Sequence, residues 1–166
     1  MSGNVYWLTG LSGAGKTTIG RLWHEELRRS GVPAVFLDGD ELRQVFGDDL
    51  GFTEADRRKS AMRNARLCAL LSRQGLTVVC CTISMFDAVR DWNRANIPGY
   101  FEVYVKAAME TLRRRDQKGL YSGGTEVAGV HFSVEEPKTP DLILENDGQT
   151  TPAEQVQRLR TTFLEE

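Results

Sequence analysis

The sequence predicts a single α/β domain built around a five-stranded, mainly parallel sheet. Five β-prone runs alternate with helix-like segments along the chain, and this alternation is typical of parallel sheets with right-handed crossover helices. The run 76–81 is almost entirely apolar, as in strands that helices cover on both faces. With 166 residues, 40% of them hydrophobic, the chain has the length and composition of one globular domain.

The first third of the chain contains two expected strands and one helix. Residues 5–9 are a short β-prone run that stops at Gly10. A helix is expected over 16–30, because its apolar side chains recur on one face and Gly31 stands where a helix-terminating glycine is common. The apolar residues 34–37 are the second expected strand.

The middle third contains a long helix, the third strand and a short helix. Thr53 is a favourable N-cap with acidic residues in the first turn after it, and the helix is expected to close at Gly75. We expect this helix to turn three leucines inward: Leu67, Leu70 and Leu71. The run 76–81 is the third strand, and a shorter helix follows over about 87–95.

The last third contains two strands, two helices and a long loop. A strand is expected at 101–105 and a helix from about residue 108. Residues 117–140 are rich in glycine and lack an apolar period, so we expect a loop that acts as a lid. The fifth strand is expected at 141–144. The last helix opens with a capping pattern: Thr151, Pro152 and Glu154.

Composition and charge exclude several classes of protein. No stretch approaches the ~18 apolar residues of a membrane-spanning helix. A net charge of −2, from 21 basic and 23 acidic residues, does not favour nucleic acid as a partner. The N-terminus carries no signal or transit pattern, so a cytoplasmic location is expected. Two histidines do not favour a zinc site, and the cysteines are expected to be reduced and buried: Cys68, Cys80 and Cys81.

A phosphate-binding loop is expected between the first strand and the first helix. Residues 10–17 read GLSGAGKT and match GxxxxGK[ST] in the strand–loop–helix context that the motif requires. Glycines let backbone N–H groups turn toward phosphate oxygens, and the helix N-terminus adds a positive dipole. Lys16 is expected to reach the β- and γ-phosphates of ATP, and Thr17 to hold Mg²⁺. The expected cofactor-binding residues here are Gly10, Ser12, Gly13, Ala14, Gly15, Lys16, Thr17 and Thr18. The alternative is a glycine-rich turn that binds nothing.

Two acidic residues end the second strand. Asp38 and Asp40 flank Gly39 and are expected near the phosphates, because ligands of open α/β sheets bind beyond the carboxyl ends of the strands. We assign Asp38 to a Mg²⁺-bound water, and Asp40 to the proton of an attacking hydroxyl group. The alternative for Asp40 is an N-cap and first-turn acid of the following helix.

Basic residues are concentrated in two segments. The first group is Arg57, Arg58, Lys59, Arg63 and Arg66, and the second is Arg113, Arg114, Arg115 and Lys118. Nucleotide phosphates would pair with some of them. A solvated helix face is the simpler interpretation for four of them: Arg58, Lys59, Arg66 and Arg113.

Further blocks of sequence carry a family resemblance. They are LDGD at 37–40 with Arg43, DLGF at 49–52 with Asp56 and Arg57, Ile83-Ser84 with Phe86, FEVYV at 101–105, RDQKGLY at 115–121, and Glu136-Pro137 with 140–142. The last of these is similar to a closing stretch that reads EAPxxPxL in the family. Together with the phosphate loop, the blocks resemble the adenylylsulfate kinase family over residues 6–147.

The resemblance implies a fold, an activity and a set of site residues. The implied fold is a P-loop kinase, a three-layer sandwich in one domain, 1–166, with a lid over about 117–140. The implied activity is phosphoryl transfer from ATP, with Mg²⁺, to the ribose 3′-hydroxyl of adenylylsulfate, in a homodimer. Lys118 joins Lys16, Asp38 and Asp40 as a catalytic residue, and Arg115 joins the residues that bind ATP. The implied substrate residues are Asp40, Arg43, Phe52, Arg57, Ser60, Ile83, Ser84, Lys118 and Leu120, with Phe52 stacked on the base.

The departures from the family pattern lie where the phosphoryl acceptor binds. Ser60 stands where the family has Asn, and Met62 where it has Arg, so one cation is missing. Met85 replaces a proline and Asp87 an arginine. Val127 stands where a second aromatic residue clamps the base, and the lid is several residues shorter. The nucleotide-donor half is therefore intact, and the acceptor half is altered.

Three functions follow from this division. The first is adenylylsulfate kinase. The second is a kinase of the same family with another nucleotide-like acceptor, such as the cytidine diphosphoramidate of bacterial capsule synthesis. The third is a nucleotide-bound switch without turnover, against which the presence of Lys16, Asp38 and Asp40 argues. No membrane partner is expected.

Overall fold

The described residues form one parallel sheet with helices on both faces. The structure is a computed structural model and describes residues 1–47, 49–116 and 134–165. The strands are β1 Val5–Thr9, β2 Ala34–Asp38, β3 Thr77–Thr82, β4 Tyr100–Lys106 and β5 Leu142–Glu145. The helices are α1 Lys16–Arg29, α2 Gly39–Phe46, α3 Glu54–Arg73, α4 Asp87–Asn96, α5 Met109–Arg115 and α6 Pro152–Phe163. The strand order is β2-β3-β1-β4-β5, and every pairing is parallel. The predicted α/β fold is confirmed.

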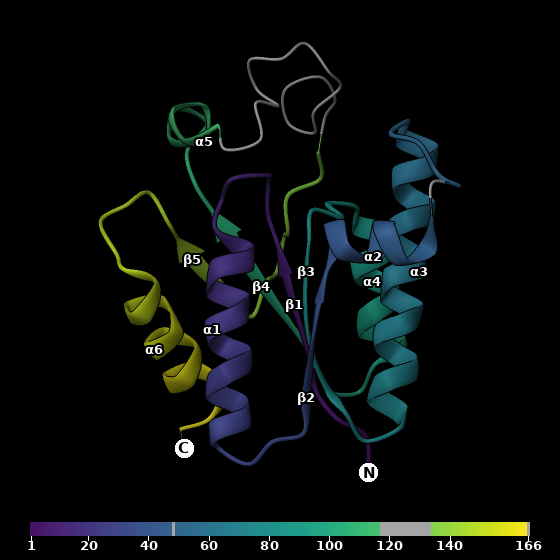
Figure 1. Cartoon of the computed structure of the whole chain (residues 1–166), viewed down its shortest axis with the longest axis vertical. Helices are drawn as coiled ribbons and strands as arrows, with labels where there is room; N and C mark the ends of the chain where they lie inside the picture. The colour runs from purple at the N-terminus through teal and green to yellow at the C-terminus, as the bar shows by residue number, and fades with distance from the viewer. Residues whose placement is uncertain (48, 117–133, 166) are drawn as a thin grey trace.

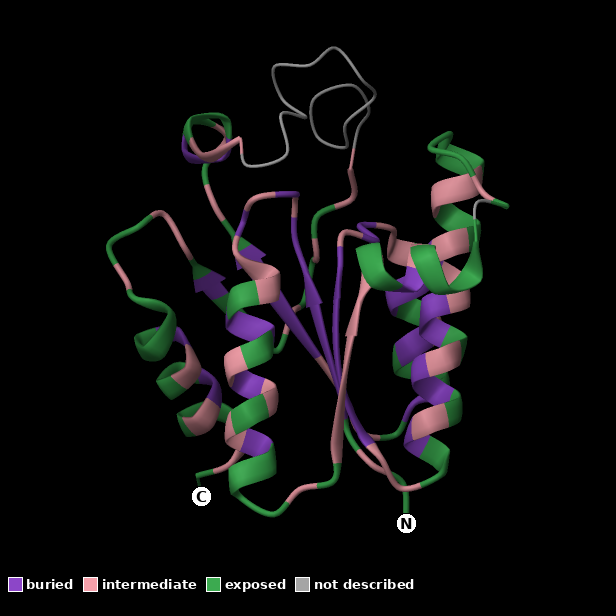
Figure 2. Cartoon of the chain, in the orientation of Figure 1, coloured by how far each residue is buried: buried purple, intermediate pink, exposed green. Residues whose placement is uncertain are grey.

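The helices make two outer layers around the sheet. Figure 1 shows α1 and α6 on one side and α3 and α4 on the other. The core on the α1 side includes Tyr6 and Trp23, whose rings meet edge to face at 5.4 Å. The core on the other side gathers Trp7 with small residues of α3 and with Val89 of α4. Strands β1 and β3 are fully buried between the layers, whereas the edge strand β2 is half-buried (Figure 2).

The inward face of α3 differs from the prediction. Leu70 is 45% exposed, so the expectation that it faces the core was wrong. The buried positions of this helix are small residues instead: Ala61, Asn64, Ala65, Cys68, Ala69 and Ser72. Small side chains let the helix approach the sheet closely. With these residues on the inner face, the 3.6-residue period of the helix puts Leu70 on the face toward solvent.

Local signals at the helix ends are confirmed. Gly31 has φ +85° just after α1, in the left-handed region that glycine adopts without strain. At the start of α6, Thr151 and Glu154 form a reciprocal capping box with Pro152 in the first turn. The three cysteines are reduced and buried, as predicted. None of the helices in the described ranges has the length and apolar character that crossing a membrane requires.

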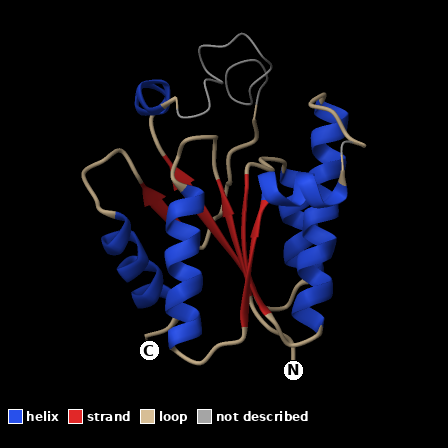
Figure 3. Ribbon diagram, viewed as in Figure 1, coloured by secondary structure: helices blue, strands red, loops and turns tan. Residues whose placement is uncertain are grey.

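The carboxyl ends of all five strands lie at the same edge of the sheet (Figure 3). The segments after Thr9, Asp38, Thr82, Lys106 and Glu145 therefore meet there. This edge is where open α/β sheets bind their ligands.

Candidate active site

The loop after β1 has the backbone shape of a phosphate cradle. Gly13 and Gly15 have φ of +85° and +102°, in the left-handed region where side chains are strained. At Gly10, an added Cβ would fall 2.2 Å from the carbonyl oxygen of Val105 on β4. Glycine is therefore required at these three positions of the motif, and the loop leads directly into the N-terminus of α1.

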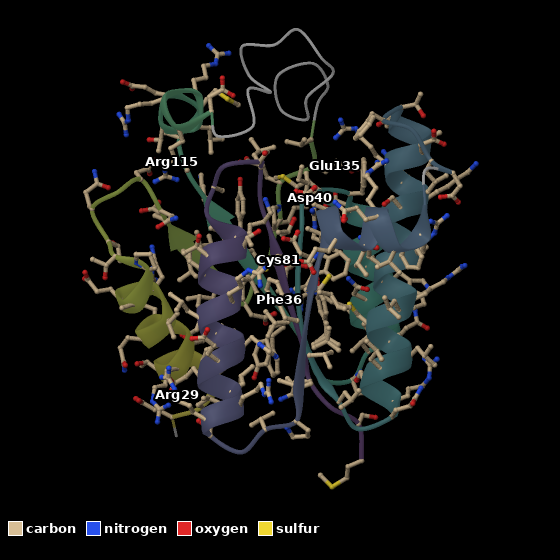
Figure 4. The ribbon with its side chains drawn as sticks, viewed as in Figure 1. Arg29, Phe36, Asp40, Cys81, Arg115 and Glu135 are labelled. Atoms are coloured by element: carbon tan, nitrogen blue, oxygen red, sulfur yellow. The ribbon has the colours of Figure 1, made fainter. Side chains whose placement is uncertain are left out.

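Two side chains, one within the loop and one from α5, hold this loop in place. The Nζ of Lys16 donates to the carbonyl oxygens of Gly10 and Leu11, at 2.8 and 2.9 Å. Arg115, at the end of α5, donates to the carbonyl oxygen of Gly13 at 3.1 Å, so the predicted cofactor residue does reach the loop (Figure 4). Its other Nη donates to the carbonyl oxygen of Asn146 at 2.7 Å.

Asn146 is a residue of this site that the sequence analysis missed. It follows β5, and its Nδ2 donates to the carbonyl oxygen of Ala14 at 2.8 Å. Its Oδ1 accepts from Gln155 of α6 at 3.4 Å, and Gln155 also donates to the carbonyl oxygen of Glu145 at 2.7 Å. Its position directly after a parallel strand is the signal that could have identified it.

The predicted metal-binding oxygens of Thr17 and Asp38 lie together beside the loop, and the backbone of Asp40 is hydrogen-bonded to them. The hydroxyl of Thr17 donates to Oδ2 of Asp38 at 3.2 Å. Oδ1 of the same carboxylate accepts from the backbone N–H of Asp40, also at 3.2 Å. Asp38 is thus the N-cap of α2, so the alternative that Asp40 is the cap was wrong. Asp40 is an exposed acid in the first turn of that helix.

The predicted base-stacking residue lies at the corner between α2 and α3. Phe52 is 58% exposed. The Arg43 guanidinium lies 4.1 Å above its ring and donates to the carbonyl oxygens of Leu50 and Gly51. Arg57 lies 5.7 Å from the same ring and donates to the carbonyl oxygen of Phe52. An aromatic face with two flanking cations suits an anionic nucleotide.

The third predicted group lies at the end of β3, between the strands that carry Asp38 and the phosphate loop. Ser84 has φ +34°, a strained conformation for a residue with a side chain, and strain of this kind is often found at functional sites. Its hydroxyl shares a hydrogen bond of 2.6 Å with Thr82. Ile83 accepts from the hydroxyl of Thr9 through its carbonyl oxygen.

The remaining predicted residues divide into two kinds. Ser60 is half-buried on α3, one turn after Arg57, and Thr18 is exposed in the first turn of α1. Lys118 and Leu120, like most of the expected lid, lie outside the described residues.

The fold and this site define a class of protein. A parallel sheet, a GxxxxGKT loop that requires its glycines, and a carboxylate hydrogen-bonded to the loop threonine are the features of a P-loop kinase.

Comparison with known proteins identifies the family within this class. The family model for adenylylsulphate kinase matches residues 2–145, so the chain belongs to that family and is a kinase. The cytidine diphosphoramidate kinase of Campylobacter jejuni is 37% identical over 164 residues, 95% of each protein. The adenylyl-sulfate kinase of Deinococcus deserti is 40% identical over 151 residues, 88% of this chain and 83% of that protein. The Mycobacterium tuberculosis APS kinase CysC, in complex with AMPPNP and APS, superposes with a TM-score of 0.89 at 33% identity over 97% of both chains.

The cofactors of the family, ATP and Mg²⁺, fit the residues present. The left-handed glycines open a cradle that a Cβ would strain, which suits a chain of phosphates. The hydroxyl and carboxylate oxygens of Thr17 and Asp38 are hard ligands of the kind that Mg²⁺ prefers.

Proposed function

We propose that this kinase transfers the γ-phosphoryl group of ATP to the ribose 3′-hydroxyl of a nucleotide whose 5′-phosphate is part of an anhydride. The observation that carries this proposal is the hydrogen-bonded series Thr17–Asp38–Asp40 at the mouth of the phosphate loop. This series supports the proposal because the backbone of Asp40, an exposed acid, is bonded to Asp38, one of the residues that would hold the metal.

Each residue then has a role in the transfer. Lys16 and the loop N–H groups bind the phosphates, and Arg115 holds the loop and the donor nucleotide. Thr17 and Asp38 would hold Mg²⁺ directly or through water, and the bound ion supplies neutralisation of phosphate charge. Asp40 accepts the proton of the ribose hydroxyl as it attacks. Lys118 is proposed to act in catalysis and, with Leu120, to contact the acceptor.

The acceptor is proposed to bind between the α2–α3 corner and the end of β3. Phe52 stacks on the base, and Arg43 and Arg57 neutralise the anhydride. Ser60, Ile83 and Ser84 complete this side of the site.

Of the two named acceptors, we favour cytidine diphosphoramidate. The Campylobacter jejuni kinase for that nucleotide matches this chain from end to end, with 95% of both proteins covered. Met62 and Val127 remove a cation and a second base-stacking ring from the acceptor side, and the loss of a ring disfavours a large purine most. Adenylylsulfate is the second candidate. It is supported by the family match and by similarity to adenylyl-sulfate kinases such as that of Deinococcus deserti, which is 40% identical.

The decisive experiment measures acceptor-dependent release of ADP. Cytidine diphosphoramidate, adenylylsulfate and a simple sugar would be compared as acceptors, with labelled ATP to identify the phosphorylated product. Transfer to the 3′-hydroxyl of either nucleotide supports the proposal, and a ratio of kcat/KM above one for the cytidine nucleotide supports the preference. ADP release that depends on neither nucleotide would overturn it. A homodimer remains a prediction, which light scattering would check.

A further inference from the structure

The segment 134–141 runs from the carboxyl edge of the sheet, where Glu135 contacts the turn after β3, along α4 to Glu102 near the start of β4. The backbone N–H of Glu135 donates to the carbonyl oxygen of Met85 at 3.1 Å. Arg90 of α4 is 3% exposed, and its Nη2 donates to the carbonyl oxygen of Glu135 and, at 2.7 Å, to Oδ1 of Asp87. The position of Glu135 is therefore fixed by a buried guanidinium, next to the predicted acceptor residue Ser84.

The carboxylates of the neighbouring residues Glu135 and Glu136 point to different elements: Glu135 to α3 and Glu136 to β4. Glu135 lies at the upper end of the sheet in Figure 4, and its Oε1 is 3.6 Å from Arg58 of α3. Arg58 is exposed, as the sequence predicted, and its guanidinium also lies 4.4 Å from the ring centroid of Phe86. Oε1 of Glu136 turns toward β4 and accepts from the hydroxyl of Tyr104 at 2.7 Å.

Tyr104 holds Glu136 near the carboxyl end of β4, one strand away from the end of β1. It is paired in register with Thr9, the residue before Gly10. Burial, together with the hydrogen bond to Glu136, raises the pKa of the Tyr104 phenol, so the phenol stays protonated and donates a hydrogen bond to the carboxylate. The Glu136 carboxylate is thereby oriented at the same sheet edge that carries the acceptor residues Ile83 and Ser84.

The hydrogen bond from Tyr104 engages only one oxygen of the Glu136 carboxylate. Glu136 is exposed, and its second oxygen, Oε2, can accept a further hydrogen bond. In the family stretch EAPxxPxL, aligned on Pro137 and Pro140, an alanine stands at this position. Relative to that family stretch, this chain carries an additional negative charge at position 136.

We propose that Glu136 is a specificity-determining residue that accepts a hydrogen bond from the N–H of a phosphoramidate at the end of the acceptor. A terminal sulfate offers only negatively charged oxygens at the same place, so the carboxylate repels it. One residue thus attracts one acceptor and rejects the other. This inference rests on the proposed function and deepens it by naming the group that distinguishes the acceptors.

The test distinguishes recognition of the acceptor's base from recognition of its terminal group. Four acceptors would be compared: cytidine diphosphoramidate, cytidine diphosphate, adenylylsulfate and adenosine diphosphoramidate. A charge-assisted hydrogen bond corresponds to about a ten- to hundredfold effect. Glu136→Ala should therefore lower kcat/KM about ten- to hundredfold for both diphosphoramidates and raise it for adenylylsulfate, with the KM for ATP unchanged. Glu136→Gln keeps an accepting oxygen without the charge, so it should retain most of the diphosphoramidate activity and also gain activity on adenylylsulfate.

The matched control is Glu135→Gln, whose carboxylate faces Arg58 and should leave the ratio among acceptors at the wild-type value. Equal changes for cytidine diphosphoramidate and cytidine diphosphate in Glu136→Ala would mean that the residue contacts the base, and the inference would be overturned. Unchanged kinetics in Glu136→Ala would overturn it as well. A wild-type enzyme that is inactive on all four nucleotides would overturn the proposed function and this inference together.

Discussion

Asn146→Ala tests whether the phosphate loop depends on a residue far from it in sequence. The amide of Asn146 donates to the carbonyl oxygen of Ala14 at 2.8 Å, and Ala14 is 1% exposed. Water therefore has poor access to the carbonyl group that the substitution leaves without its partner. The contact of Arg115 with residue 146 is made to the backbone, so it survives the substitution.

The magnitude follows from that one hydrogen bond. Leaving a buried carbonyl group without a donor is unfavourable by about 1–3 kcal/mol. If the phosphate loop becomes less ordered in the variant, part of the binding free energy of ATP is used to order the loop again. A loss of about 1–2 kcal/mol from the binding free energy weakens ATP binding roughly five- to thirtyfold. Isothermal titration with a non-hydrolysable ATP analogue would measure the dissociation constant, and urea unfolding the stability.

Gln155→Ala is the control for this prediction. Gln155 is fully buried and donates to the carbonyl oxygen of Glu145 at 2.7 Å, while its contact with Asn146 is longer, 3.4 Å. Its removal should lower stability by a similar amount and leave ATP affinity near the wild-type value. If Asn146→Ala is destabilised like the control but binds the ATP analogue normally, the reasoning about the loop is refuted.

Three further predictions concern turnover and pH. Lys16→Ala should abolish turnover without unfolding the chain, because Lys16 offsets charge on the transferring group; a near-normal kcat would contradict this role. Asp40→Asn should lower kcat by roughly 10²-fold or more with ATP affinity unchanged, and a collapse of ATP binding would indicate a metal or structural role instead. Burial raises the pKa of Glu102, so the folded state holds its proton to higher pH than the unfolded chain does. Wild-type stability should therefore fall relative to that of Glu102→Gln as pH rises from about 4 through the raised pKa, and a pH-independent difference in urea unfolding would contradict this.

The elements of the fold could be predicted because their signals are local. The capping pattern at Thr151 and the glycine at residue 31 act within one helical turn, and both are present in the structure as expected. The face of α3 could not be predicted in the same way. Which residues face inward depends on how closely the helix approaches the sheet, and the small residues Ala61, Ala65 and Ala69 decide that distance. Leu70 is apolar, but it lies on the other side of the helix.

In the candidate site too, residues within local motifs could be predicted, whereas contacts between distant segments could not. Lys16 and Thr17 lie in one contiguous motif, and Asp38 ends the next β-prone run along the chain, so these three residues could be proposed from the sequence pattern. Arg115 was proposed from the family resemblance. Asn146 is 132 residues from the loop residue that it contacts. Its position after β5 could mark it as a site residue, but it does not predict the contact with Ala14.

The acceptor half is assembled from segments that the chain brings together only on folding. The α2–α3 corner, the turn after β3 and the segment 134–141 each supply part of it, and Arg90 and Tyr104 hold the last of these in place. None of these three segments is part of the phosphate loop. A substitution such as Glu136 can therefore change which nucleotide is accepted while the loop, its glycines and the Thr17–Asp38 hydrogen bond stay as they are. Such an arrangement explains how one family of kinases can retain its phosphoryl donor and change its acceptor.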